Sequence, residues 1–99
     1  MDSLTPKQRA HLKSLAHPLK PVLHIGKEGV THAVRQSVLD AFQNRELLKV
    51  KVLEAAPDDA RTIAATLGEL EALHVVQVIG RTVVLYRRHP EHPEIVLPR

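Results

Sequence analysis

The sequence predicts a single α/β domain in which helices alternate with short strands and a hairpin closes the chain. Three observations support this class. Helix-start residues precede three segments with helical apolar spacing, short apolar strands lie between them, and Gly80-Arg81 separates two β-rich runs. The expected order is α-β-α-β-α-β-β, giving a sandwich of helices on a four-stranded mixed sheet. Residues 1–99 form one domain, because single domains commonly run about 100–150 residues.

The first helix is predicted from its start chemistry. Thr5 can cap the free backbone donors, Pro6 suits the first helical position, and Gln8 stands where a capping box places its return partner. Pro18 should end the regular helix near His17. Apolar residues with helical spacing predict the buried stripe: Leu12, Leu15, Ala16 and Leu19.

The middle of the chain predicts strand, helix and strand. Residues 21–25 form a short strand that ends abruptly at a glycine, and Thr31 caps a second helix. The apolar positions of this helix are Val34, Val38, Ala41 and Phe42. Residues 48–52 alternate strictly, which predicts a strand with one buried face and one wet face that carries Lys49 and Lys51.

The last part of the chain predicts a helix, a hairpin and a tail. Asp58 and Asp59 suit the positive N-terminal end of a third helix. Its expected buried stripe is Ala60, Ile63, Ala64, Leu67 and Leu70. Residues 74–79 and 82–87 flank a Gly-X pair that suits a two-residue type II′ turn. Three prolines favour an extended, proline-rich tail over residues 89–99.

Composition restricts the class of protein. No apolar run approaches the roughly 20 residues that span a bilayer, so no membrane partner is expected. The segment from Met1 to Pro6 lacks the basic and apolar regions of a secretory signal, so a cytoplasmic location is expected. The absence of cysteine excludes disulfides and thiolate chemistry. Residues 1–54 carry nine Lys/Arg and five acids, a net +4, whereas residues 55–99 are net −1, which suggests a polyanionic partner.

The most informative feature is the loop Gly26-Lys27-Glu28-Gly29 between the first strand and the second helix. Two glycines allow a tight turn and a close backbone approach to a ligand, and the helix N-terminus favours a phosphate. GXXG loops of this kind clamp nucleic-acid backbones in KH-type modules. Alternatively, the glycines simply turn a strand into a helix. The loop is not a nucleotide-hydrolysing P-loop, because the Gly-Lys-Ser/Thr ending is missing.

The chain resembles the YhbY family, the stand-alone bacterial form of the CRM (chloroplast RNA splicing and ribosome maturation) domain. The resemblance rests on residues 12–22, on the loop at 26–29, on the strand at 48–52 and on the hairpin at 76–87, and it covers about residues 4–88. It implies an RNA-binding module related in shape to the C-terminal domain of translation initiation factor 3. Bacterial members associate with precursors of the large ribosomal subunit.

The resemblance implies an RNA-binding site around the loop. Carried over to this chain, the site has Gly26 and Gly29 as the loop glycines, with Lys27 and Glu28 between them. Basic residues around that loop complete the candidate site: Arg9, Lys13 and Lys20. Arg9 and Lys13 also fall side by side on one flank of the first helix. The expected partners are ribosomal RNA in a large-subunit precursor and, in addition, ribosomal proteins.

Other residue patterns do not point to chemistry. Pro90 and Pro93 prevent a helix from aligning His89 with His92, so no metal site is expected, and no cofactor either. His24 lies next to the loop and either touches RNA or packs against a helix. No serine or carboxylate pair has a catalytic context, so the protein is not expected to be an enzyme. The only aromatic residues are Phe42 and Tyr86, so phosphate and shape contacts should dominate over base stacking.

Two functional hypotheses remain open. The first is a monomeric RNA-binding protein that acts in ribosome assembly, for which Lys49 and Lys51 either extend the phosphate-binding face or form a solvated strand face. The second is a protein-interaction module that docks a ribosomal protein or an assembly GTPase through the open sheet face or the tail. Binding that persists at high salt and after nuclease treatment would favour the second.

Overall fold

The computed structural model describes residues 3–99 and contains the seven elements in the expected order. Their bounds are α1 Pro6–Ala16, β1 Pro21–Ile25, α2 His32–Ala41, β2 Leu47–Val52, α3 Ala60–Leu67, β3 His74–Ile79 and β4 Thr82–Tyr86. Strands β1 and β2 pair in parallel and the other two pairings are antiparallel, so the predicted four-stranded mixed sheet is confirmed. Met1 and Asp2, which contributed to the expectations on targeting and charge, lie outside the described residues.

The predicted helix starts are confirmed. The Thr5 hydroxyl accepts a hydrogen bond from the Gln8 amide at 3.1 Å, and the Gln8 side chain accepts one from the Thr5 amide at 3.0 Å. This is a capping box, and it satisfies two backbone donors at once. Thr31 and Asp59 cap α2 and α3 in the same position. The third helix ends at Leu67, so Leu70 lies beyond it and packs against the core from the following turn.

The strand order in the sheet is β1-β2-β4-β3, so the last strand inserts between the second and the third. Gly80 has φ +57, and Arg81 is not among the residues with positive φ. That combination fits the predicted type II′ turn, in which only the first of the two central residues has a positive φ. The hairpin therefore fixes β3 as one edge of the sheet, while β1 forms the other.

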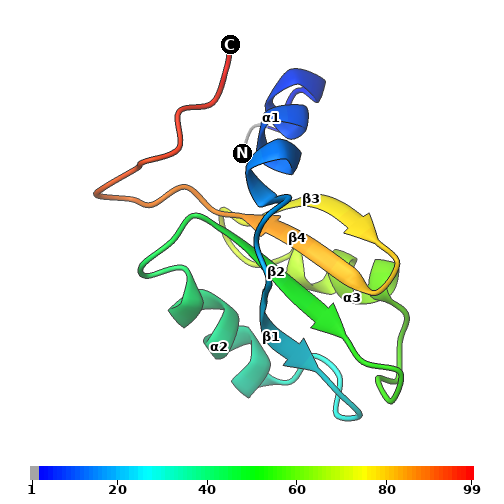
Figure 1. The fold of residues 1–99 in the computed structure, drawn as a ribbon. Helices are drawn as coiled ribbons and strands as arrows, with labels where there is room; N and C mark the ends of the chain where they lie inside the picture. Colours follow the sequence, from blue (N-terminus) through cyan, green and yellow to red (C-terminus); the bar gives the residue numbers. More distant parts are fainter. Residues whose placement is uncertain (1–2) are drawn as a thin grey trace.

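The helices cover the two faces of the sheet unequally, with α1 on one side and α2 and α3 on the other (Figure 1). The larger core lies between the sheet and α2 and α3, and it includes Ile25, Val38, Phe42, Val50, Ile63, Leu67, Val83 and Leu85. The smaller core lies under α1 and consists of Leu12, Ala16, Leu47, Val76, Val84 and Tyr86. Leu4, Ile95 and Leu97 pack against the smaller core, so the segment before α1 and the tail both contact the α1 side.

Two sequence expectations for this side need correction. Leu15 and Leu19 belong to the predicted buried stripe of α1, but they are 40% and 38% exposed. Of the apolar residues of α1, only Leu12 and Ala16 are buried against the sheet, because no second helix on this face covers the rest. The face of β2 that carries the lysines was expected to be exposed to solvent, but it is only partly so. Leu47 is buried beneath α1, Lys49 is half-buried and Lys51 is exposed.

The tail after β4 contains no helix or strand, yet it is held against the domain by Glu46. The carboxylate of this buried residue accepts three backbone hydrogen bonds, from His89 at 2.8 Å, Glu94 at 2.7 Å and Ile95 at 2.8 Å. Figure 1 shows the tail running back past the side of the molecule that carries α1. No helix in residues 3–99 is long and apolar enough to cross a membrane.

Candidate nucleic-acid interface

The glycine loop is a tight turn that joins β1 to α2. The Gly29 amide donates to the Gly26 carbonyl at 3.0 Å, which closes the turn. Gly29 has φ +68, and a Cβ there would lie 3.0 Å from Pro57 Cγ. Gly26 has no such restriction: its nearest neighbour would be Leu53 Cδ1 at 3.8 Å, an ordinary contact. The fold therefore requires glycine at position 29, whereas at position 26 it would accommodate a Cβ.

The two glycines are expected to respond differently to substitution. Gly29→Ala should lower the free energy of unfolding by about 1–2 kcal/mol, because alanine is strained in the left-handed region and must displace Pro57. Gly26→Ala should change it by less than about 0.5 kcal/mol. Urea unfolding of both variants, followed by far-ultraviolet circular dichroism, makes the comparison. Equal destabilisation would show that both glycines serve only the turn.

The loop presents donors and a cation to solvent. Lys27 and Glu28 are both exposed. Thr31 uses its hydroxyl to accept from the Val34 amide at 3.1 Å, and the amides of the two residues between them cannot have partners within the helix. These amides, together with the helix dipole, favour an anion near the loop.

The structure separates the other predicted site residues. The Arg9 guanidinium donates to the carbonyls of Val75 and Val76, both at 2.7 Å, where an irregularity interrupts the register of β3. Arg9 thus hydrogen-bonds α1 to the edge strand β3, and its positive charge lies at that edge of the sheet. Lys13 and Lys20 are exposed, and within residues 3–99 neither side chain makes a hydrogen bond.

These residues do not form one compact cluster. Lys27 follows the end of β1, whereas α1 lies over the start of β2 and β3. The two places are about 15 Å apart, because some five residues of extended strand separate them at about 3.3 Å per residue. What connects them is the exposed part of the sheet on the α1 side.

Lys49 and Lys51 occupy that connecting surface. They alternate with Val50 and share a face with Leu47, which is buried under α1. Lys51 pairs in register with His24 on one side and Thr82 on the other, and the Lys49 ammonium lies 3.4 Å from the His17 carbonyl at the end of α1. We name as the basic strip the residues Lys13, His24, Lys27, Lys49 and Lys51.

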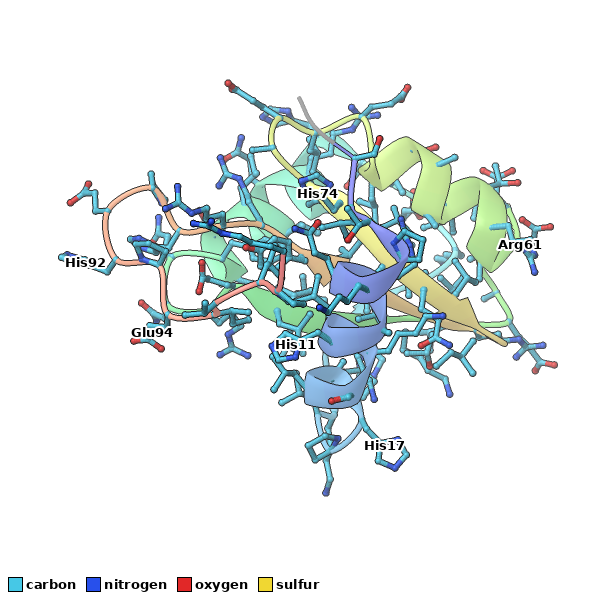
Figure 2. All side chains as sticks on the ribbon, turned by 90° about the horizontal axis from the view of Figure 1, so that it is seen from above. His11, His17, Arg61, His74, His92 and Glu94 are labelled. Carbon is cyan, nitrogen blue, oxygen red and sulfur yellow. The ribbon has the colours of Figure 1, made fainter. Side chains whose placement is uncertain are left out.

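The flank of α1 that carries Lys13 lies away from the tail. In Figure 2 His11 lies on the tail side of α1, toward His92 and Glu94, whereas His17 lies on the other side. Arg9, Lys13 and His17 follow one another at four-residue spacing and share a flank. The sequence placed Lys49 and Lys51 on one strand face, but it gave no position for α1, so it could not join them to Lys13.

Two acids near the loop end of the sheet are engaged elsewhere, whereas Glu28 in the loop and Asp58 are exposed. Glu54 forms an exposed ion pair with Arg81 at 3.1 Å. Asp59 accepts the Thr62 amide at 2.8 Å as the cap of α3, and this hydrogen bond lowers the pKa of its carboxyl. Residues 3–99 contain no group of three His, Asp or Glu side chains placed to hold a metal ion. The surface is thus a cationic strip that ends beside the loop, and the first amides of α2 after the loop have no partner within the helix.

The comparisons with known proteins agree on one family. The model of the CRS1/YhbY (CRM) domain matches residues 4–87. The Bacillus subtilis "Probable RNA-binding protein YqeI" is 39% identical over 95 residues, which cover 96% of this chain and 99% of that protein. A Haemophilus influenzae "RNA-binding protein" is 38% identical over 99 residues, covering 100% of this chain and 99% of the relative. The solution structure of Staphylococcus aureus SAV1595 superposes with a TM-score of 0.80 at 44% identity, covering 96% of this chain and 99% of that one.

Proposed function

The chain belongs to the CRS1/YhbY (CRM) domain family, and on that basis we propose that it binds structured RNA through the loop at 26–29 and the basic strip, without catalysing a reaction. The observation that carries the proposal is the continuity of the surface. Lys49 and Lys51 of β2 and His24 of β1 share the sheet face that carries α1, and Lys27 follows the end of β1. Relatives that cover nearly the whole chain are named as RNA-binding proteins.

The proposed grip combines a close contact with longer-range attraction. At Gly26 a phosphate would meet no Cβ of the loop residue itself, and the first amides of α2, which follow the loop, would add donors for it. Lys27, Lys49 and Lys51 then neutralise successive phosphates and release their counterions. Arg9 and Lys20 extend the positive field beyond the strip.

Recognition should depend on shape more than on sequence. Phe42 and Tyr86 are 3% and 2% exposed, so neither offers an open ring for base stacking on the strip. A phosphate-led surface suits a folded RNA whose backbone follows the strip. We propose that this RNA is ribosomal RNA in a precursor of the large subunit, and that holding it helps the subunit assemble in the cytoplasm.

The test is a titration of large-subunit ribosomal RNA with the purified protein across a salt series, beside a Gly26→Asp variant. Affinity should fall with salt, with a log–log slope of roughly −0.7 to −0.9 per phosphate neutralised. Gly26→Asp should weaken binding at least tenfold, because it places a carboxylate against the phosphate while the fold tolerates the Cβ. Gly26→Ala serves as the matched control for the added bulk. Salt-independent binding, or full affinity in Gly26→Asp, would contradict the proposal.

A protein partner is the second candidate, favoured by Leu15 and Leu19. Their exposed side chains line a shallow cavity with Leu47 and Ile95, of about 290 Å³. An apolar anchor from a ribosomal protein or an assembly GTPase would fit such a surface. Leu15→Ser/Leu19→Ser should then abolish association that survives nuclease and high salt, and should leave RNA affinity unchanged. Persistence of the association in this variant would exclude the cavity.

A further inference from the structure

A separate pocket lies at the opposite end of the sheet from the glycine loop. It has a volume of about 490 Å³, within the range of small-molecule sites. Segments far apart in the sequence build it: the start of the chain, the beginning of β3, the end of β4 and the tail. Its walls include Leu4, Gln8, His74, Tyr86, Arg88 and Leu97. Neither the loop nor the basic strip contributes to it.

Three polar side chains of this pocket make no hydrogen bond to another described residue. Within residues 3–99, the Tyr86 hydroxyl, the His74 imidazole and the Arg88 guanidinium make no hydrogen bond. Tyr86 is only 2% exposed as a whole, but within residues 3–99 no side-chain oxygen or nitrogen is both buried and without a partner, so its hydroxyl is the part that reaches the pocket. Burial also raises the pKa of Tyr86. Burial lowers the pKa of His74, and the nearby positive charge of Arg9 lowers it further. Both groups are therefore neutral at pH 7, and both can donate a hydrogen bond.

The pocket combines an aromatic wall with positive charge. The rings of His74 and Tyr86 lie 6.0 Å apart and are tilted by 33°, and Leu4 and Leu97 add apolar surface. Arg88 is exposed at the rim, and no Asp or Glu is among the described lining residues. Figure 2 shows His74 near the beginning of α1. Such a site suits a planar aromatic group that carries an anion.

The backbone beside the pocket is also unusual. Ala72 lines it and has φ +62, the one left-handed residue other than glycine in residues 3–99. Such a conformation persists only where the surrounding structure holds it, and these conformations cluster at ligand sites. The strained turn places His74 at the start of β3, opposite Tyr86 in the register.

We propose that this pocket binds a single unpaired nucleotide of the RNA that the protein holds, with the base against His74 and the apolar wall of Leu4 and Leu97, and the phosphate at Arg88. The inference rests on the proposed RNA-binding function and adds a second contact to it. It differs from the contact at the strip, which takes the backbone of a folded RNA. An RNA that reaches both sites must therefore present an unpaired nucleotide next to a structured segment.

The test uses uridine and adenosine 5′-monophosphate, a single-stranded oligonucleotide and a blunt RNA duplex as probes. Amide signals of Ala72, His74 and Tyr86 in nuclear magnetic resonance spectra report on the pocket. Arg88→Ala should weaken binding of the mononucleotides and the single strand about tenfold, the loss of one charge-assisted hydrogen bond, while duplex affinity stays unchanged. Arg61→Ala removes an exposed arginine on α3 and is the matched control. Tyr86→Phe, which keeps the ring, should weaken mononucleotide binding by a smaller factor.

The outcomes separate this proposal from the RNA-binding function. If the mononucleotides leave the pocket signals unmoved while the duplex still binds the strip, the pocket proposal is wrong and the proposed function stands. If a mononucleotide binds but Arg88→Ala leaves the single strand unaffected, the site takes free nucleotides and the RNA contact is refuted. If neither RNA binds, the proposed function itself fails. Joint weakening of mononucleotide and single strand in Arg88→Ala supports the proposal.

Discussion

Lys13→Glu/Lys51→Glu is expected to weaken binding to structured ribosomal RNA by about 100-fold at physiological salt. Each exposed lysine should contribute one charge-assisted hydrogen bond of about 1.5 kcal/mol, and two such bonds correspond to about two factors of ten. The two residues come from α1 and β2, so the double variant tests whether RNA follows the strip across both elements. Because both are exposed, the free energy of unfolding should change little.

The matched control reverses two cations away from the strip. Arg61→Glu/Arg99→Glu changes the net charge by the same amount, but Arg61 lies on α3 and Arg99 at the chain end, both exposed. Fluorescence anisotropy measures the RNA affinity of both variants over a salt series. The comparison separates the loss of contacts at the strip from the effect of a lower net charge. The strip variant should reduce the log–log salt slope by about 2, because two phosphates are no longer neutralised by a lysine. Equal weakening in the two variants would mean that only net charge matters and that the strip is not the binding surface.

Glu46→Ala is expected to lower the free energy of unfolding by about 3 kcal/mol and to release the tail. Glu46 is 5% exposed, and its carboxylate is the acceptor for three tail amides. Hydrogen bonds to a charged group are worth about 1.5–3 kcal/mol each, but the freed amides regain water once the tail detaches. For a domain of this size the melting temperature should fall by more than about 10 °C.

The same residue predicts a pH dependence of stability. Burial alone would raise the pKa of Glu46, but the amides of Ile95, His89 and Glu94 outweigh burial and hold the pKa below its ordinary value of 4.5. The unfolded chain therefore takes up this proton at a higher pH than the folded protein. Stability from Glu46 is fully present above pH 4.5 and is lost as the pH falls through the lower, folded pKa.

Glu46→Gln isolates this contribution, because the amide keeps one oxygen acceptor and cannot titrate. Between about pH 7 and pH 3 the native protein should lose more stability than Glu46→Gln, measured by urea unfolding at each pH. The protection factors for hydrogen exchange at the Glu94 and Ile95 amides, which correct for the slower intrinsic exchange at low pH, should fall in Glu46→Ala and in the native protein at low pH. A tail that stays protected in Glu46→Ala would show that Ile95 and Leu97 hold it by packing alone.

Much of the fold could be predicted because local chemistry dictates it. Thr5, Thr31 and Asp59 cap helices through hydrogen bonds within three residues, so the sequence alone identifies these starts. Gly80 is required by a two-residue turn in the same local way. The apolar spacing of α2 and α3 correctly predicted Val38, Phe42, Ile63 and Leu67 as core.

The candidate site was harder to predict, since its parts meet only through the sheet. Arg9 and Lys13 are equivalent by sequence spacing, but the irregular register of β3 exposes two carbonyls to Arg9 alone. The importance of Lys49 and Lys51 comes from the position of α1, and that of Glu46 from a tail 43 to 49 residues away. None of these interactions leaves a periodic or local pattern in the chain.

The sequence by itself determined the element order, the helix caps, the hairpin and the loop at 26–29, because each depends on neighbours within a few residues. Only the tertiary structure decided that β4 lies between β2 and β3, that α1 alone covers one face, and that Gly29 but not Gly26 is needed by the fold. These features depend on which apolar surfaces pack together although they are far apart in the sequence. The hydrophobic effect that drives this packing has no preferred direction, so it leaves no local pattern in the chain. Burial therefore determines which residues lie in the core. The packing of the helices on the sheet then determines which exposed residues lie together on one surface.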